Sequence, residues 1–262
     1  MRNPLERSWS SYNYNYRVPL LQKLRKKDSK AEAKYSSDEW YEKNKIFSFD
    51  ELVKAELKLL KACLAPGGNA ERSSSKRYST KEWAAPIFER RQAKGLPGMI
   101  SLDESCYGKR VSNAVPRRQW QELVEDQPHK EIDVENLHLV QSLVGRSIYV
   151  LPLEWWYALY PMKDLHVVCS EDLRYRASRT MSNVSDFLGL PSFDFTNITN
   201  AGIYNSGAHT GYDKITEWDK TVYVPDNIPI SDELRKEYMD FLKPYNERLF
   251  QMTGQNCDWY EI

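Results

Sequence analysis

An arginine, a proline and a serine at the start of the chain have the types and spacing of an anion-binding site. Proline is favoured at the first position of a helix, so the sequence predicts a helix that opens at Pro4 with Asn3 as its cap. Arg2 can donate two hydrogen bonds to phosphate oxygens beside that helix N-terminus, and Ser10, about two turns into the helix, can donate its hydroxyl. These residues predict a phosphate site. The spacing alone leaves open a surface helix with a solvated arginine.

The same residues resemble a known family. The pattern Arg-Asn-Pro-x-Glu-Arg-x-x-Ser-x-Tyr over residues 2–12 is similar to the 3'-phosphate-binding motif of sulfotransferases that use 3'-phosphoadenosine-5'-phosphosulfate (PAPS), in the carbohydrate branch related to heparan sulfate O- and N-sulfotransferases. Later segments resemble that family in the same order: Ser147-Ile148-Tyr149, Leu165-His166-Val167-Val168, Glu171-Asp172-Leu173, Asp186-Phe187-Leu188-Gly189-Leu190-Pro191 and Lys243-Pro244-Tyr245-Asn246-Glu247-Arg248-Leu249. The resemblance covers residues 1–64 and 137–262.

This resemblance implies a function and a set of binding residues. It implies transfer of a sulfuryl group from PAPS to a hydroxyl or amine of a carbohydrate acceptor, with 3',5'-ADP as product, no metal, and a location in the Golgi lumen or secretory pathway. Arg2 and Ser10 match the two phosphate ligands of the family. Relatives carry a second nucleotide-binding loop with a Lys-Gly-Arg type of sequence, and Gly211, Tyr212 and Lys214 stand in its place. The acidic pair at 171–172 is mainly a structural mark of the family.

One part of the family's apparatus is not recognisable in these residues. In relatives, an upstream strand, loop and helix bind the 5'-phosphosulfate, and a glutamate shortly after them commonly acts as the base. No Gly-rich loop with Lys and Ser or Thr occurs in this sequence, so the catalytic residues are unknown. We therefore expect an N-terminally incomplete sulfotransferase whose residues 1–262 alone hold the 3'-phosphate without catalysing transfer. The alternatives are a non-catalytic, sulfotransferase-derived module that binds nucleotide or anionic glycan, and a helical interaction protein.

The composition limits the class of protein. A chain of 262 residues with 41% hydrophobic content can build one substantial core, so we expect one domain over residues 1–262. Lys plus Arg equals Asp plus Glu at 37 each, which gives no general argument for a nucleic-acid partner. No apolar run approaches the ~20 residues of a membrane span. The oligomeric state is not predicted.

Local signals predict the elements that position the motif. The signals are a capping box at Ser48–Glu51 before a helix that Pro66 stops, a helix from 137 that Gly145 closes, a helix over 149–160, an apolar strand over 165–169, and a helix capped by Ser231, broken at Pro244 and continued to Thr253. Together they predict an α/β fold with a parallel strand between helices. The family resemblance implies a single domain with a central, mainly parallel sheet flanked by helices, the P-loop-like sulfotransferase fold, N-terminally incomplete. Residues 69–136 are expected to form an insert or covering loop.

The cysteines and glycosylation sequons carry further expectations. The four cysteines have no metal-ligand spacing. Cys63 and Cys106 are expected to bridge in an oxidising lumen, as cysteines of family members often do, and Cys169 is expected to be a buried thiol in the strand. Two sequons begin at Asn183, inside an expected helix, and at Asn197, in an expected loop.

Overall fold

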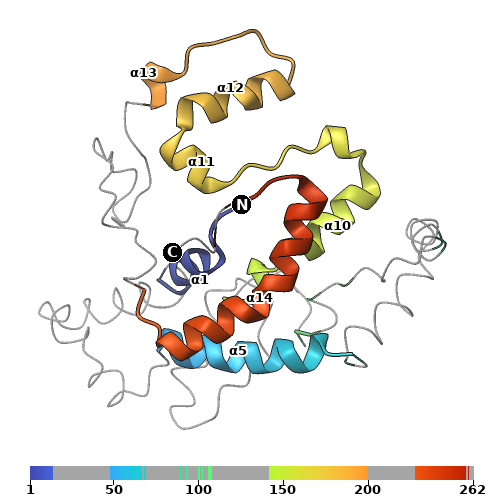
Figure 1. Cartoon of the computed structure of the whole chain (residues 1–262), viewed down its shortest axis with the longest axis vertical. Helices are drawn as coiled ribbons and strands as arrows, with labels where there is room; N and C mark the ends of the chain where they lie inside the picture. Colours follow the sequence, from blue (N-terminus) through green and yellow to red (C-terminus); the bar gives the residue numbers. More distant parts are fainter. Residues whose placement is uncertain are drawn as a thin grey trace, which may run out of the picture. The chain divides into compact units, whose positions relative to one another are not determined.

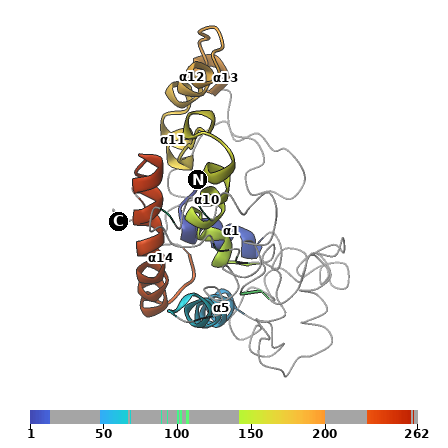
Figure 2. The ribbon, with the colours of Figure 1, turned by 90° about the vertical axis from the view of Figure 1, so that its right-hand side faces the viewer.

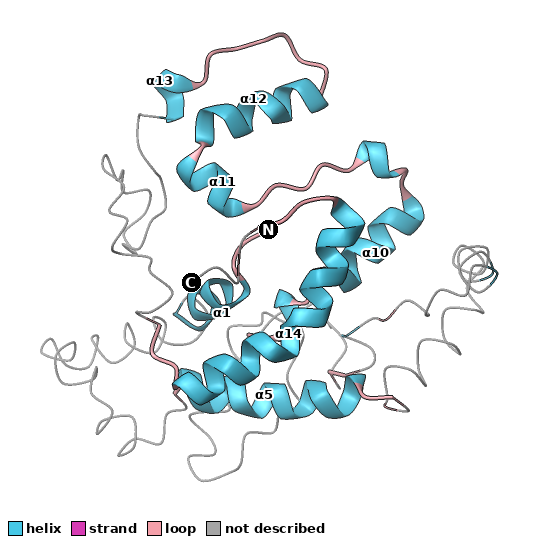
Figure 3. Cartoon of the chain, viewed as in Figure 1, coloured by secondary structure: helices cyan, strands magenta, loops and turns pink. Residues whose placement is uncertain are grey.

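The chain falls into two compact units, and each is described by itself. The computed structural model describes residues 1–13, 48–66, 142–199 and 228–257, with the single residues 68, 89, 93, 100, 102, 106, 107 and 259. The first unit comprises Met1–Asn3, Tyr160–Ile228 and Phe250–Ile262, and the second comprises Pro4–Leu159 and Pro229–Leu249 (Figure 1). All regular elements in the described ranges are helices (Figure 3). The predicted single domain stays a prediction, and most of the predicted insert at 69–136 lies outside the described residues.

The second unit is built from helices whose starts follow the predicted signals. They are α1 (Pro4–Tyr12), α5 (Phe49–Leu64), the 3-10 turn η4 (Gly145–Ser147), α10 (Val150–Leu159) and most of α14 (Asp232–Thr253). The capping box is confirmed, because the Ser48 hydroxyl accepts from the backbone of Glu51 at 3.2 Å and the Glu51 carboxylate accepts from the backbone of Ser48 at 2.7 Å. Ser231 likewise caps α14 by accepting from the backbone N–H of Leu234 at 3.4 Å.

The core of the second unit lies where these helices meet. Its buried apolar side chains include Leu5, Leu52, Val53, Leu57, Leu60, Val144, Ile148, Leu151, Leu242 and Leu249. Figures 1 and 2 show α5 alongside the first part of α14, and Lys61 and Glu237 form an ion pair between them at 2.6 Å. The predicted Cys63–Cys106 bridge is confirmed, and its Cα atoms are 5.6 Å apart, the usual distance for a disulfide.

The predicted helix that Gly145 closes is wrong in its described part. Residues 142–144 are not helical, and Gly145 begins the turn η4 instead of ending a helix. The reason is that the backbone N–H groups of Leu143, Val144 and Gly145 donate to the buried carboxylate of Glu56, at 2.8, 3.1 and 3.0 Å. A side chain from α5 therefore replaces the backbone acceptors that a helix would supply.

The predicted break at Pro244 is also wrong, because α14 runs as one helix from Asp232 to Thr253. Proline removes one backbone hydrogen bond from a helix interior and crowds the preceding turn. On either side of it, however, Tyr238, Leu242 and Leu249 are fully buried. Burial of this apolar stripe offsets the lost bond, since a fully buried side chain of this size contributes about 1.5–3 kcal/mol.

The first unit contains the 3-10 turn η5 (Met162–Asp164) and the helices α11 (Ser170–Tyr175), α12 (Ala177–Phe187) and α13 (Thr196–Thr199). The expected strand at 165–169 has extended backbone at both ends but is not assigned as a strand. The Met1 amino group nevertheless donates to the carbonyl of Val168, and the Met1 carbonyl accepts from the N–H of Ser170 at 2.5 Å. This is the pattern of a parallel strand pair, with Met1 opposite Cys169.

Both glycosylation sequons lie within described helices. Asn183 lies within α12, as expected, whereas the second sequon lies in the short helix α13 and not in a loop. Within the described ranges, the structure contains no helix with both the length and the apolar character needed to cross a membrane.

Candidate functional site

The structure places the predicted site residues in different parts of the chain. Arg2 belongs to the first unit and Ser10 to the second, and both side chains are partly exposed. Gly211, Tyr212 and Lys214 lie outside the described residues. The phosphate site predicted from Arg2 and Ser10 therefore stays a prediction, although the helix on which it depends begins at Pro4, as the sequence indicates.

The backbone that carries Arg2 is fixed by contacts on both sides. Met1 pairs with the extended segment before α11, and the backbone N–H of Asn3 donates to the Glu171 carboxylate at 3.1 Å. Because Arg2 lies between these two anchored residues, its backbone is held in one place. Glu171 thus has the structural role that the family resemblance implies.

The neighbouring motif residues in α1 point into the second unit. The guanidinium of Arg7 donates to the carbonyls of Leu143 and Ser142, at 2.8 and 3.3 Å. Ser8 is fully buried, and its hydroxyl contacts the Tyr238 hydroxyl at 2.8 Å. Burial lowers the pKa of Arg7 and raises the pKa of Tyr238. These residues fix α1 in the second unit. Their roles could not be predicted from the sequence beyond their place in the motif.

A second polar cluster surrounds Glu56, which is only 2% exposed. In addition to three backbone N–H groups, its carboxylate accepts from the hydroxyls of Tyr107 and Ser142. Burial, and then the nearby Glu56 carboxylate, raise the pKa of Tyr107 well above its usual value. All five donors bond to a carboxylate inside the protein, so the cluster holds residues 142–145 against α5.

The first unit contains a pocket of about 370 Å³ with a mostly polar lining. It is lined by His166, Val167, Val168, Asp172, Arg176, Arg179, Thr180, Asn183, Gln255 and Asn256. Three walls supply these residues: the extended segment before α11, the two helices α11 and α12, and the loop that follows α14.

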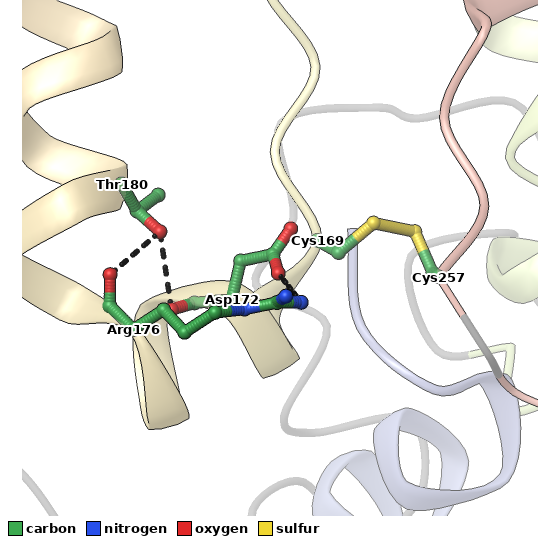
Figure 4. Close-up of polar contacts among 5 residues, drawn as sticks. All are labelled: Cys169, Asp172, Arg176, Thr180 and Cys257. Atoms are coloured by element: carbon green, nitrogen blue, oxygen red, sulfur yellow. Dashed lines mark hydrogen bonds and ion pairs between the residues drawn. A yellow bond between two sulfur atoms is a disulfide. The ribbon is translucent and has the colours of Figure 1, made fainter.

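The wall formed by the two helices is fixed at the corner between them (Figure 4). The Thr180 hydroxyl donates to the carbonyls of Asp172 and Arg176, at 3.1 and 3.0 Å, and so bonds the first turn of α12 to α11. The Arg176 guanidinium forms an ion pair with the Asp172 carboxylate. Arg179, one turn further along, is exposed, and no partner for it occurs in the part of the chain that the structure describes.

A disulfide joins the other two walls. The expectation that Cys169 is a buried thiol is wrong, because Cys169 forms a disulfide with Cys257 (Figure 4). Their Cα atoms are 5.5 Å apart, the usual distance for a bridge. Val168 and Asn256 both line the pocket. Each is followed directly by a cysteine of the bridge, Cys169 or Cys257, so the disulfide holds these two lining residues close together. It holds the loop after α14 against the extended segment.

The pocket was not predicted, although the sequence contained one signal for it. Residues 176, 179, 180 and 183 stand at helical spacing and so form one polar stripe with two arginines. The stripe can donate several hydrogen bonds to an anion. Among the described residues, no group of His, Cys, Asp and Glu has the arrangement of a metal site.

The sequence is related to known sulfotransferases. It is 18% identical to membrane-associated sulfotransferase kil1 of Dictyostelium discoideum over 99% of this chain. Over 44% of this chain it is 27% identical to heparan sulfate glucosamine 3-O-sulfotransferase 5 of Homo sapiens and 26% identical to that of Mus musculus. The chain spans 46% of the first relative and 34% of each of the others, less than half of their lengths. No family model and no solved structure matches it. The predicted resemblance to sulfotransferases is confirmed.

Proposed function

We propose that this chain, a relative of sulfotransferases, is part of an enzyme that transfers a sulfuryl group from PAPS to a hydroxyl or amine of a carbohydrate. The observation that carries the proposal is the relation to a sulfotransferase over 99% of the chain. The name of the human relative adds the acceptor class, because that protein acts on glucosamine in heparan sulfate. The residues of the 3'-phosphate motif, Arg2 and Ser10, agree with PAPS as donor.

The chemistry sets the roles that residues of such an enzyme must fill. The acceptor oxygen or nitrogen attacks the sulfur atom, the bond from sulfur to the phosphate oxygen breaks, and the acceptor proton passes to a base. The products are the sulfated carbohydrate and 3',5'-ADP. In our proposal Arg2 and Ser10 bind the 3'-phosphate and so orient the donor for in-line attack. We assign no residue as the base.

We also propose an α/β fold with a parallel sheet that includes residues 165–169. The hydrogen bonds of Met1 with Val168 and Ser170 support this, since each extended residue of the pair is followed within three residues by a helix. In such sheets, ligands bind at the carboxyl ends of the strands. Arg2 directly follows Met1 and therefore lies at that end.

The two disulfides support a location in the secretory pathway, such as the Golgi lumen. Cys63–Cys106 and Cys169–Cys257 account for all four cysteines of the chain. Disulfides persist in oxidising compartments and are rare in the reducing cytosol. Detection of both bridges by peptide mapping of the protein from its native cells would test this location.

Calorimetric titration with 3',5'-ADP tests the proposed donor site. We expect Arg2→Lys to weaken binding by about tenfold, because a guanidinium makes two parallel hydrogen bonds to phosphate and an ammonium makes a point contact. Arg146→Lys is the matched control, since Arg146 is exposed in the second unit and is not part of the motif. Equal affinities of wild type and Arg2→Lys, or no binding by the wild type, would contradict the proposal.

A further inference from the structure

The pocket of the first unit combines cationic and amide side chains in one small space. Arg176 and Arg179 come from the α11–α12 corner, Asn183 from α12, and Gln255 and Asn256 from the loop after α14. Arginines bind carboxylate and sulfate groups, and side-chain amides both donate to and accept from hydroxyls. The lining therefore offers partners for a molecule that carries negative charge and hydroxyl groups together.

We propose that this pocket binds an acidic saccharide, with Arg179 on a carboxylate or sulfate group and the amides on neighbouring hydroxyls. This proposal rests on the proposed function, because the saccharide is taken to be the carbohydrate acceptor of that reaction. It assigns the pocket to the acceptor and not to the nucleotide.

The composition of the lining favours a saccharide over a nucleotide. No Phe, Tyr or Trp occurs among the lining residues that the structure describes. The ring of His166 is already stacked on Phe187, with centroids 4.9 Å apart. A base is held by apolar and aromatic surfaces, which this lining lacks. The volume of about 370 Å³ lies at the small end of the range of about 300–1,000 Å³ for small-molecule sites, which fits a short segment of a sugar chain.

The ion pair between Arg176 and Asp172 reduces the positive charge that the pocket presents to a ligand. Asp172 neutralises Arg176, so Arg179 is the main cation available to a ligand among the described lining residues. Replacement of Asp172 by asparagine removes one negative charge and releases the Arg176 guanidinium. The proposal therefore predicts tighter binding by Asp172→Asn and weaker binding by Arg179→Gln. Tighter binding is the sharper test, because damage to the fold cannot produce it.

Binding of a heparan sulfate tetrasaccharide, measured by calorimetry at low salt without nucleotide, tests the proposal. We expect Arg179→Gln to weaken binding by about tenfold, as for loss of a charge-assisted hydrogen bond. We expect Asp172→Asn to tighten it by about threefold, as for removal of a partly exposed opposing charge. The matched control is Arg174→Gln, since Arg174 is in the same unit but outside the lining. It should bind like the wild type.

Several outcomes would overturn the proposal. They are no binding by the wild type, equal losses in Arg179→Gln and Arg174→Gln, weaker binding by Asp172→Asn, and equal binding of a neutral tetrasaccharide. Competition by 3',5'-ADP would also overturn it, because it would place the nucleotide in the pocket. Failure here is distinct from failure of the proposed donor site, which is tested by 3',5'-ADP alone and by Arg2→Lys.

Discussion

Replacement of Glu56 by glutamine is expected to destabilise the protein by about 2–4 kcal/mol. One carboxylate oxygen of Glu56 accepts from the backbone N–H groups of Leu143 and Val144, and the other accepts from the N–H of Gly145 and from two hydroxyls. Glutamine has nearly the same shape, but it presents one oxygen and one NH₂ group. The cost therefore depends on which donors lose their acceptor.

The less costly orientation of the glutamine can be worked out from these contacts. In this orientation the glutamine oxygen still accepts from the N–H groups of Leu143 and Val144. Its NH₂ group faces the hydroxyls of Tyr107 and Ser142, which can rotate and accept. The N–H of Gly145 is then left without an acceptor, at a cost of about 1–3 kcal/mol for a buried donor. Loss of charge from the remaining hydrogen bonds adds roughly 1 kcal/mol. Glu56→Ala removes the acceptor for all five donors and should cost about 5 kcal/mol or more.

Urea denaturation followed by circular dichroism measures these differences. The matched control is Glu247→Gln, because Glu247 is an exposed glutamate of α14 in the same unit. The control should stay within about 0.5 kcal/mol of the wild type. The reasoning would be refuted if Glu56→Gln were as stable as the control, or if Glu56→Ala were no less stable than Glu56→Gln.

Three further changes are expected to alter stability. Gly145→Ala should cost about 1–3 kcal/mol by denaturation, because a Cβ there would overlap the Tyr107 hydroxyl; an unchanged midpoint would contradict this. Joint replacement of Cys169 and Cys257 by serine should cost about 4.6 kcal/mol, from a bridge that spans 88 residues; because the variant keeps only the Cys63–Cys106 bridge, reducing agent should destabilise it less than it destabilises the wild type, and equal losses on reduction would contradict this. Burial raises the pKa of Tyr107 and Tyr238 above the usual value near 10. Above about pH 10 the unfolded chain therefore releases these two protons before the folded chain does. The contribution of the two tyrosines to the free energy of unfolding is complete below about pH 10 and is lost as the pH rises above it. Denaturation at pH 9 and 11 should show the fall, and Tyr107→Phe should reduce its slope.

The starts of the helices were predictable because their signals are local. Pro4, Ser48 with Glu51, and Ser231 each act on backbone groups within one turn of themselves. The interior of α14 was not predictable in the same way. Pro244 predicts a break, but the helix continues because residues on both sides of it are buried against the rest of the unit.

The role of Glu56 could have been suspected from the sequence. It stands four residues after Leu52 and four before Leu60, so it lies on the apolar face of its helix, where a charge needs a buried partner. The partners themselves could not be identified, because they lie 51 to 89 residues away along the chain. The partner of Cys169, Cys257, could not be identified from the sequence either, because it lies 88 residues away.

The pocket of the first unit reaches the pairing of Met1 with Cys169, because Val168, whose carbonyl accepts from Met1, also lines the pocket. Arg2 follows Met1, at the edge where a ligand would bind in the proposed α/β fold. Arg2 is not among the residues that line the pocket, and the main cation of the described lining, Arg179, belongs to α12. The proposed 3'-phosphate site and the proposed saccharide site therefore use different cations. It follows that Arg2→Lys should leave saccharide affinity unchanged and Arg179→Gln should leave 3',5'-ADP affinity unchanged, and a variant that weakened both ligands would show that they share one site.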